Sequence, residues 1–94
     1  MNATPRVSVV LPAYNVAGSL PAAVASALNQ SLASVEVLIA DDGSSDGTAE
    51  VAADLARRDP RVRVLRAPRN AGAAAARNRA LAAARGDWVA LLDA

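Results

Sequence analysis

Two adjacent carboxylates, Asp41 and Asp42, are the residues of this sequence best placed to do chemistry. They follow the apolar run 35–40 and precede Gly43, which permits a tight turn. A turn that leads into a helix cap explains the glycine, but it does not explain two acids. Because neighbouring side chains of a strand point to opposite faces, only one of the two can easily enter a crevice at the strand end. Such a carboxylate can ligate Mg²⁺, Mn²⁺ or Ca²⁺, or act as a general base.

The chain contains no Cys and no His, which narrows its chemistry further. Their absence excludes a disulfide, a thiolate nucleophile, a Ser-His-Asp triad and a Cys/His zinc site. Ten Arg and nine acids leave a net charge of +1, too little to favour nucleic acid or an anionic membrane as a partner. The apolar runs are too short to span a bilayer, and the first residues do not resemble a signal peptide, so we expect a cytoplasmic protein.

Four other positions are candidates for a binding site. Tyr14 is the only Tyr, and its ring either stacks on a base or fills a gap in a loop. The segment 70–72 offers backbone amides to a phosphate ahead of an Ala-rich helix, although a plain helix start explains it better on its own. We expect the stem of Arg77 to be partly covered and its guanidinium to reach a diphosphate, and Arg79 to be solvated. Asp93 ends an apolar run, either as a metal ligand or as a turn acid.

These residues are spread over short β-rich runs that alternate with longer Ala-rich runs. With 94 residues, the chain has room for one small domain. The patterns predict strands over 7–11, 35–40, 61–65 and 88–92, and helices over 19–28, 46–58 and 72–85.

This alternation predicts an α/β fold, a Rossmann-like three-layer α/β/α arrangement around a parallel sheet. The strand 61–65 alternates Arg with Val, which is typical of an edge strand, so the simplest strand order is 3-2-1-4. That order reverses direction between strands 1 and 4 and opens a ligand crevice at their carboxyl ends.

The core is expected to be thin, because 25 of the 94 residues are Ala. We also expect the fourth strand to leave a sheet edge exposed, and urea unfolding to show a low midpoint or no cooperative transition.

Four motifs, in this order and spacing, resemble those of family 2 glycosyltransferases of the GT-A fold. They are Val7–Asn15, Asp41–Thr48, Asn70–Gly72 with Ala76–Asn78, and Gly86–Trp88 leading to Leu92–Ala94. The family's sheet core has the order 3-2-1-4, in agreement with the strand patterns.

The resemblance implies an enzyme that transfers a sugar from a nucleotide-diphosphate donor to a glycan, lipid or protein acceptor. It implies UDP as the expected nucleotide and inversion at the anomeric centre of the sugar. It implies that Tyr14 lies against the nucleobase and that Asp42 accepts a hydrogen bond from it. The residues that match nucleotide-binding positions are Pro12, Ala13, Tyr14, Asp41, Asp42, Gly72, Arg77 and Asp93.

The resemblance also implies a divalent metal, Mg²⁺ or Mn²⁺. Asp93 matches the first acid of the family's Asp-x-Asp motif, which holds the metal and the donor's diphosphate, and the second acid is expected at the next position after the chain's last residue. We expect residues 1–94 to be the donor-binding part of a GT-A domain, truncated at its C-terminal end and inactive alone. No catalytic base is assigned within them. Segments outside them can attach the enzyme to the inner face of the membrane.

Three other functions are alternatives for a sequence of this kind. A nucleotide-binding module without catalysis fits the missing second acid and base. A phosphoacceptor receiver domain also places acids at strand ends, but it requires a Lys, and the chain has none. A sugar nucleotidyltransferase would have a Gly-rich, Arg-bearing first loop at 12–15, where Pro-Ala-Tyr-Asn stands.

Overall fold

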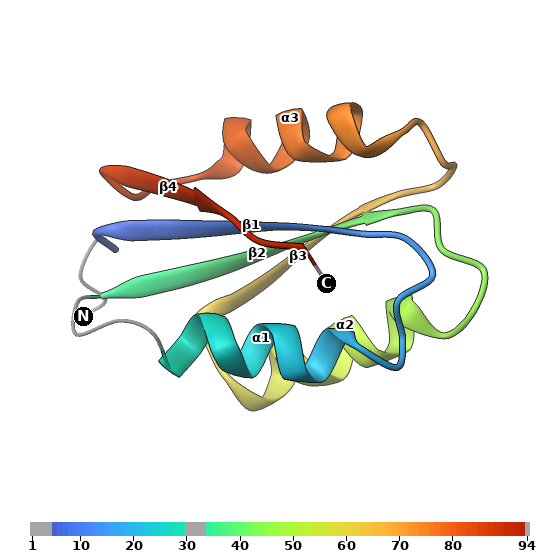
Figure 1. Cartoon of the computed structure of the whole chain (residues 1–94), viewed down its shortest axis with the longest axis horizontal. Coiled ribbons are helices and arrows are strands. Elements are labelled where there is room, and N and C mark those ends of the chain that lie inside the picture. Colours follow the sequence, from blue (N-terminus) through green and yellow to red (C-terminus); the bar gives the residue numbers. More distant parts are fainter. Residues whose placement is uncertain (1–4, 30–33, 94) are drawn as a thin grey trace.

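A computed structural model describes residues 5–29 and 34–93 of the chain. Within these ranges the chain alternates strictly between strand and helix (Figure 1). The elements in chain order are β1 Val7–Ala13, α1 Leu20–Asn29, β2 Val35–Asp42, α2 Thr48–Arg58, β3 Val62–Ala67, α3 Ala73–Ala83 and β4 Trp88–Leu91.

The four strands form one parallel sheet with the order β3-β2-β1-β4. This confirms the predicted α/β class, the strand order and the edge position of the third strand. In the register, Ala13 at the end of β1 lies beside Asp41 at the end of β2, and Asp42 lies beside Ala67 at the end of β3. The carboxyl ends of the three strands therefore meet at one edge of the sheet, as a reversal of strand order requires.

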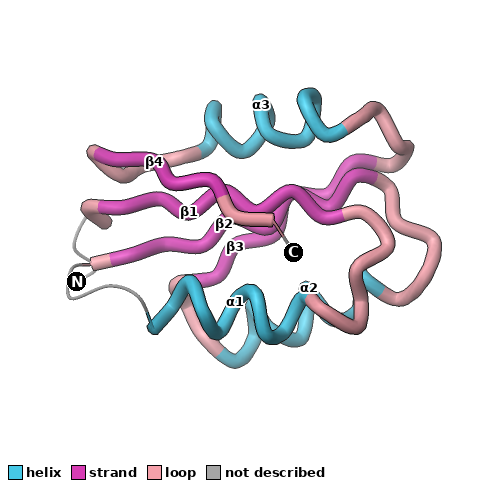
Figure 2. The backbone as a smooth tube through the Cα atoms, viewed as in Figure 1, coloured by secondary structure: helices cyan, strands magenta, loops and turns pink. Residues whose placement is uncertain are grey.

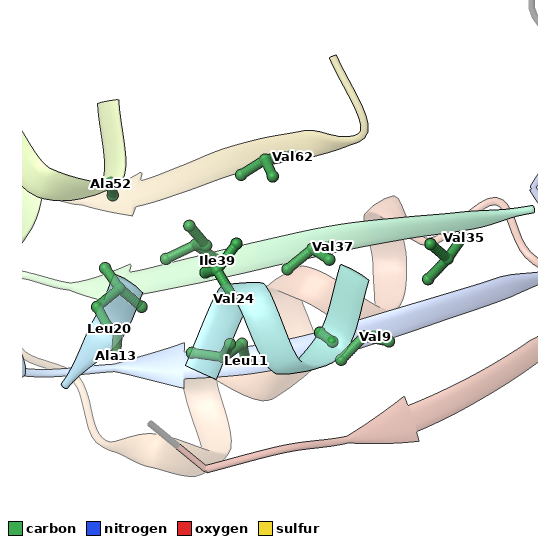
Figure 3. Packing of buried hydrophobic residues seen from close by; sticks show 11 residues of the cluster. Val9, Leu11, Ala13, Leu20, Val24, Val35, Val37, Ile39, Ala52 and Val62 are labelled. Atoms are coloured by element: carbon green, nitrogen blue, oxygen red, sulfur yellow. The ribbon is translucent and has the colours of Figure 1, made fainter. Parts of the chain in front are cut away.

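Helices cover both faces of the sheet, which makes the three layers that the alternation predicts (Figure 2). Helices α1 and α2 lie together on one face and α3 lies alone on the other (Figure 1). The larger core cluster is on the face of α1 and α2, where Leu11, Leu20 and Ile39 are fully buried (Figure 3). Leu20 and Val24, which are four residues apart on one face of α1, are buried in this cluster.

Helix α3 packs against the opposite face through alanines. Ala76 and Ala80 are fully buried against Val10, Leu38 and Ala40 of the sheet. Small side chains allow a helix to approach a sheet closely. This close packing holds the first turn of α3 next to the carboxyl ends of the strands.

The strand β4 is the second edge of the sheet, and all four of its residues are exposed. Trp88 is 68% exposed and Leu91 is 58% exposed. A continuous apolar run usually indicates a strand covered on both faces. Here the run is uncovered within the described part of the chain, because β4 pairs only with β1 there, in agreement with the exposed edge expected from the sequence. No helix in residues 5–29 or 34–93 is long and apolar enough to cross a membrane.

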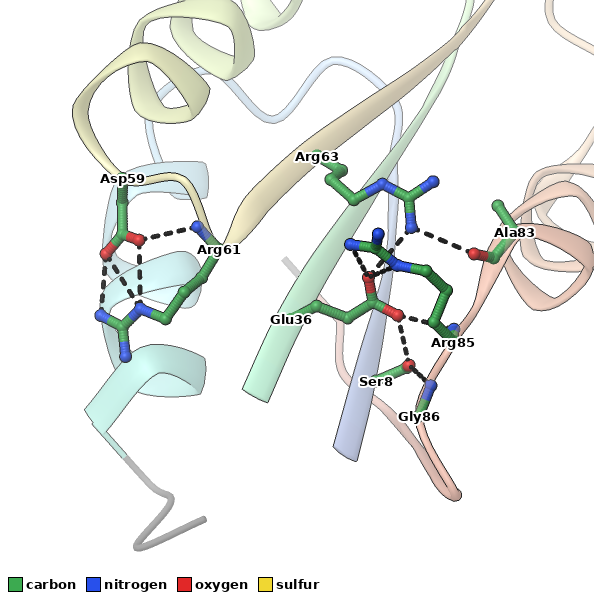
Figure 4. A network of polar contacts seen from close by, with 8 residues as sticks. All are labelled: Ser8, Glu36, Asp59, Arg61, Arg63, Ala83, Arg85 and Gly86. Atoms are coloured by element: carbon green, nitrogen blue, oxygen red, sulfur yellow. Dashed lines mark hydrogen bonds and ion pairs between the residues drawn. The ribbon is translucent and has the colours of Figure 1, made fainter. Parts of the chain in front are cut away.

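A buried acid of β2, near the amino ends of the strands, connects β1, β3 and the segment after α3 (Figure 4). Glu36 of β2 accepts hydrogen bonds from the Ser8 hydroxyl at 2.6 Å, the Arg85 backbone amide at 2.7 Å and the Arg63 guanidinium at 2.9 Å. Burial alone would raise the pKa of Glu36, but these hydrogen bonds and the charge of Arg63 together lower it below the ordinary value. The Ser8 hydroxyl also accepts the Gly86 amide at 2.8 Å, which fixes the start of the segment leading to β4.

Candidate functional site

The carboxyl ends of the strands form one wall of a pocket of about 410 Å³. Its walls come from the β1–α1 loop, the end of β2, the first turn of α3 and the residue after Leu92. The lining residues are Pro12, Ala13, Tyr14, Val16, Asp42, Asn70, Gly72, Ala73, Ala76 and Asp93. Six of the eight residues predicted to bind nucleotide are therefore brought together here, and Asp41 and Arg77 are not among the lining residues.

The two adjacent acids point to opposite faces of the sheet, as the pleat of a strand requires. Asp42 lines the pocket, whereas Asp41 is completely buried beneath the β2–α2 loop. Asp41 accepts a hydrogen bond from the Ser44 amide at 3.1 Å and lies 3.7 Å from the Arg66 guanidinium. Its other oxygen has no hydrogen-bond partner among the described residues. Asp41 therefore supports the β2–α2 loop, and its role at the nucleotide stays a prediction.

Asp42 connects the end of β2 to the loop before α3. One carboxylate oxygen accepts the Ala71 amide at 3.0 Å, and the other accepts the Gly72 amide at 2.9 Å. The Asp42 carboxylate is nearly fully buried, with 4% of the side chain exposed. Its position at the wall of the pocket leaves its remaining lone pairs as the acceptors nearest to a bound ligand.

These contacts favour the plain helix start over a phosphate site for the backbone amides of 70–72. Two of them, those of Ala71 and Gly72, already donate to Asp42, and Gly72 also donates to the side chain of Asn70 at 3.0 Å. A neighbouring carboxylate competes for amides that a phosphate would need. The unpaired amides at this end of α3 belong instead to its first turn, which begins at Ala73.

The β1–α1 loop carries Tyr14, whose side chain is exposed at the pocket. The residue after it, Asn15, has a left-handed backbone with φ 53. Asn adopts this conformation more readily than most residues, because its short polar side chain makes local hydrogen bonds. Here the Asn15 amide donates to the Ser44 hydroxyl at 3.0 Å, and its side-chain oxygen accepts the Ser45 amide at 2.9 Å.

Two further hydrogen bonds join the same pair of loops. The Val16 amide donates to the Thr48 hydroxyl at 2.9 Å, and the Ala17 amide donates to the Asp46 carboxylate at 3.2 Å. Asp46 also accepts the Thr48 amide at 2.9 Å at the start of α2, where Gly47 is the N-cap residue. The hydrogen bond from the Thr48 hydroxyl is the main reason that the pKa of Asp46 is lowered. We call this set of four contacts, made by Asn15, Val16 and Ala17 with 44–48, the loop clamp.

The two arginines of α3 lie opposite to the prediction. Arg77 is exposed, and Arg79 is partly buried, with 35% of its side chain exposed and its guanidinium 3.7 Å from Asp42. The reason is that α3 buries the face of Ala76 and Ala80, whereas Ala74 and Leu81, which share a face with Arg77, are exposed. Arg79 immediately precedes the buried Ala80, and its guanidinium lies near the end of β2. The role of Arg77 at the nucleotide stays a prediction.

Asp93 lies at the pocket, is exposed and follows β4 by two residues. No group of three or more His, Cys, Asp or Glu residues that could hold a metal ion occurs in the described part of the chain. The other acid of the pocket, Asp42, already accepts two backbone amides. The described residues therefore offer a metal one available carboxylate and do not form a complete metal site.

Four lining residues are not among the eight predicted to bind nucleotide: Val16, Asn70, Ala73 and Ala76. A signal was available for Asn70, which stands next to the predicted Gly72 in a short polar segment between strand and helix. No signal marked the two alanines, because Ala occurs on every side of α3.

The relatives of this chain are glycosyltransferases. It is 44% identical over 93 residues to the hyaluronan synthase of Pasteurella multocida, covering 99% of this chain and 10% of that protein. It is 45% identical over 89 residues to the succinoglycan biosynthesis protein ExoO of Rhizobium meliloti (strain 1021), covering 95% of this chain and 25% of that protein. The chain thus spans a quarter or less of the length of these two relatives.

Solved structures show the same fold. The crystal structure of S. aureus TarS 1–349 superposes with a TM-score of 0.82 at 28% identity, covering 94% of this chain and 27% of that one. The Pyrobaculum calidifontis mannosyltransferase PcManGT, in complex with GDP-Man and Mn²⁺, superposes with a TM-score of 0.73 at 27% identity, covering 88% of this chain and 25% of that one. The glycosyl transferase family 2 model matches residues 8–94, and the chain belongs to that family.

Proposed function

We propose that this chain is the donor-binding part of a glycosyltransferase. The enzyme transfers a sugar from a nucleotide-diphosphate donor, with UDP as the expected nucleotide, to a glycan, lipid or protein acceptor, and it inverts the anomeric centre. The observation that carries the proposal is the pocket at the carboxyl ends of the strands, where Tyr14, Asp42 and Asp93 meet. Family membership supports it, as does the solved complex of S. aureus TarS with UDP-GlcNAc, which has a TM-score of 0.80 to this chain.

In this proposal the pocket recognises the base through a ring and a carboxylate. The exposed ring of Tyr14 offers a flat surface for stacking, which is worth about 1–3 kcal/mol per base in other proteins. Asp42 is an acceptor held in place by two backbone amides, and it suits a base that presents a ring N–H, such as uracil. Pro12, Ala13 and Gly72 complete the wall around the base.

The diphosphate is proposed to lie between the first turn of α3 and Asp93. The unpaired amides at the start of a helix favour an anion, and Arg77 lies on the second turn of the same helix. We propose that Asp93 supplies one oxygen ligand to Mg²⁺ or Mn²⁺, with no step of the reaction assigned to the metal. The acceptor site and the general base are assigned to none of the described residues.

Isothermal titration of the 94-residue chain with UDP tests this function. Asp42→Ala should abolish binding, whereas Asp54→Ala, on the exposed side of α2, should leave it unchanged. Because Asp42 also holds two amides, a second comparison is needed. N3-methyl-UDP lacks the ring N–H, and its binding should be weaker than that of UDP by about tenfold, the equivalent of one lost charged hydrogen bond. Equal binding of the two ligands, or unchanged binding by Asp42→Ala, would overturn the site.

A nucleotide-binding module without catalysis is the second candidate. The observation that favours it is that the described residues form the pocket by themselves. Incubation with UDP-GlcNAc and Mn²⁺ tests this candidate. Release of UDP would exclude a module without catalysis, whereas binding with no release of UDP is expected of residues 1–94 in both candidates.

A further inference from the structure

Arg79 has buried donors with nothing to bond. Its Nε and Nη2 atoms are inaccessible to solvent, and neither has a hydrogen-bond partner among the described residues. Buried polar groups without partners are rare in proteins, because each loses its hydrogen bonds to water. An unpaired guanidinium next to a pocket therefore calls for a functional explanation.

The nearest charge to Arg79 is the carboxylate of Asp42. The Nη2 atom lies 3.7 Å from Asp42 Oδ1, the same oxygen that accepts the Ala71 amide. Among the ion pairs of the described residues, Arg79 is the only cation that reaches Asp42. Since Asp42 is nearly fully buried, the interaction between these two charges is stronger than the same pair would have on the surface.

Arg79 reaches the pocket through Asp42. Asp42 lines the pocket, whereas Arg79 is not among the lining residues and lies next to Asp42. The exposed Arg77, two positions earlier, has no ion pair among the described residues.

We propose that Arg79 is a positioning residue for nucleotide binding, which orients the Asp42 carboxylate to accept the ring N–H of the base. The inference rests on the proposed function of Asp42. Two amides from one loop hold the carboxylate, and Arg79 supplies a positive charge 3.7 Å from one of its oxygens. A small movement brings its unpaired N–H groups within hydrogen-bond distance, so that the carboxylate oxygens are held as the base binds.

A double-mutant cycle on UDP binding tests the inference. The variants are Arg79→Gln, Asp42→Asn and the double variant, with Arg58→Gln as the control, because Arg58 is exposed and pairs with Asp54 on α2. We expect Arg79→Gln to weaken UDP binding by about tenfold, and to change it by less than about twofold when Asp42 is already Asn. We also expect Arg79→Gln to reduce the preference for UDP over N3-methyl-UDP, a ratio that a purely structural role would leave unchanged.

The outcomes separate this inference from the proposed function. If wild type binds no UDP, or binds it as well with Asn at position 42, both fail. If Asp42→Asn weakens binding but Arg79→Gln does not, or if the two effects simply add, Arg79 does not act through Asp42 and only this inference is overturned. Should Arg79→Gln lower the urea midpoint more than Arg58→Gln, Arg79→Lys carries the test. Lys keeps the charge without the planar donors, so a loss of about threefold is expected, and unchanged affinity and preference would overturn the inference.

Discussion

The side-chain oxygen of Asn15 accepts the backbone amide of Ser45 at 2.9 Å, across the gap between the β1–α1 and β2–α2 loops. In return, the Asn15 amide donates to the hydroxyl of Ser44, the neighbour of Ser45. A single residue thus pairs with two consecutive residues of the other loop. Because Tyr14 immediately precedes Asn15, this exchange fixes the backbone that carries the exposed ring at the pocket.

Replacing Asn15 tests the loop clamp. Asn15→Gly removes the side-chain acceptor and tolerates the left-handed backbone, so it should lower the free energy of unfolding by about 1 kcal/mol and weaken UDP binding by about fivefold. Asn15→Ala also strains the backbone and should lower the free energy of unfolding by about 1 kcal/mol more. Urea unfolding and UDP titration measure both effects. UDP affinity equal to that of wild type in Asn15→Gly would show that the Tyr14 loop is held without this side chain.

Two glycines offer a matched pair for the approach of the β2–α2 loop to residues 69–70. A Cβ on Gly43 would lie 2.5 Å from the Arg69 carbonyl carbon, and φ at Gly43 is +73. A Cβ on Gly18 meets nothing within 4 Å. Gly43→Ala should therefore lower the free energy of unfolding by more than about 2 kcal/mol, while Gly18→Ala should change it by less than about 1 kcal/mol. Similar urea midpoints for the two variants would contradict the close approach.

The pH dependence of stability should reveal the buried Glu36. Its pKa is below the ordinary value of 4.5 in the folded chain, so the unfolded chain binds the proton more readily. The stabilisation from Glu36 is therefore fully present above about pH 5 and is lost as the pH falls through the folded pKa. Glu36→Gln should lower the free energy of unfolding at pH 7 by about 1–3 kcal/mol, and this difference should shrink toward pH 3.

Urea unfolding followed by circular dichroism between pH 3 and pH 7 measures this difference. Glu50→Gln is the control, because Glu50 is exposed on the first turn of α2 and should change the free energy of unfolding by about 0.5 kcal/mol or less. Asp46, Asp54 and Asp59 also have lowered pKa values, so wild type itself loses stability in acid. A gap between wild type and Glu36→Gln that stays constant with pH would contradict the assignment to Glu36.

The single Trp reports on the exposed edge strand. Trp88 is 68% exposed in β4, so its fluorescence emission should already resemble that of a tryptophan in water. Unfolding in urea should then shift the emission maximum by only a few nanometres, while the circular dichroism signal of the helices is lost. A large red shift on unfolding would mean that β4 is covered in solution, for example by a second copy of the chain.

The order of the strands in the sheet could be predicted from the sequence, because strand 61–65 alternates Arg with Val and so identifies the edge strand. The end of α3 could not. The predicted helix continues to Arg85, but the structure ends it at Ala83, where the chain becomes extended and the Arg85 amide reaches Glu36, 49 residues away in sequence. Gly86 then packs against Ser8 so closely that a Cβ would lie 2.7 Å from the Ser8 amide nitrogen. Local propensity contains no information about such distant partners.

The candidate site also has a part that could be predicted from the sequence and a part that could not. Asp42, Tyr14 and Asp93 could be placed at the pocket because strand ends in a parallel sheet converge. It could not be predicted that Arg79, and not Arg77, is the partly buried arginine. Alanines surround both residues on α3, so no stripe of large apolar residues shows which face of the helix packs on the sheet. The packing of α3 on the sheet decides which arginine lies near Asp42, and this packing is known only from the structure.

The loop clamp and the contacts of Asp42 make the three loops around the pocket a single unit for protein engineering. Side chains of 44–48 satisfy the backbone amides of 15–17, and Asp42 satisfies those of Ala71 and Gly72. A graft of one loop from a relative would leave donors of the next loop without acceptors unless these partner residues are kept. Recombination among relatives should therefore be tolerated when residues 14–72, which include all three loops, come from one parent. A single crossover inside α1 or α2 should be tolerated only where both parents have the same partner residues.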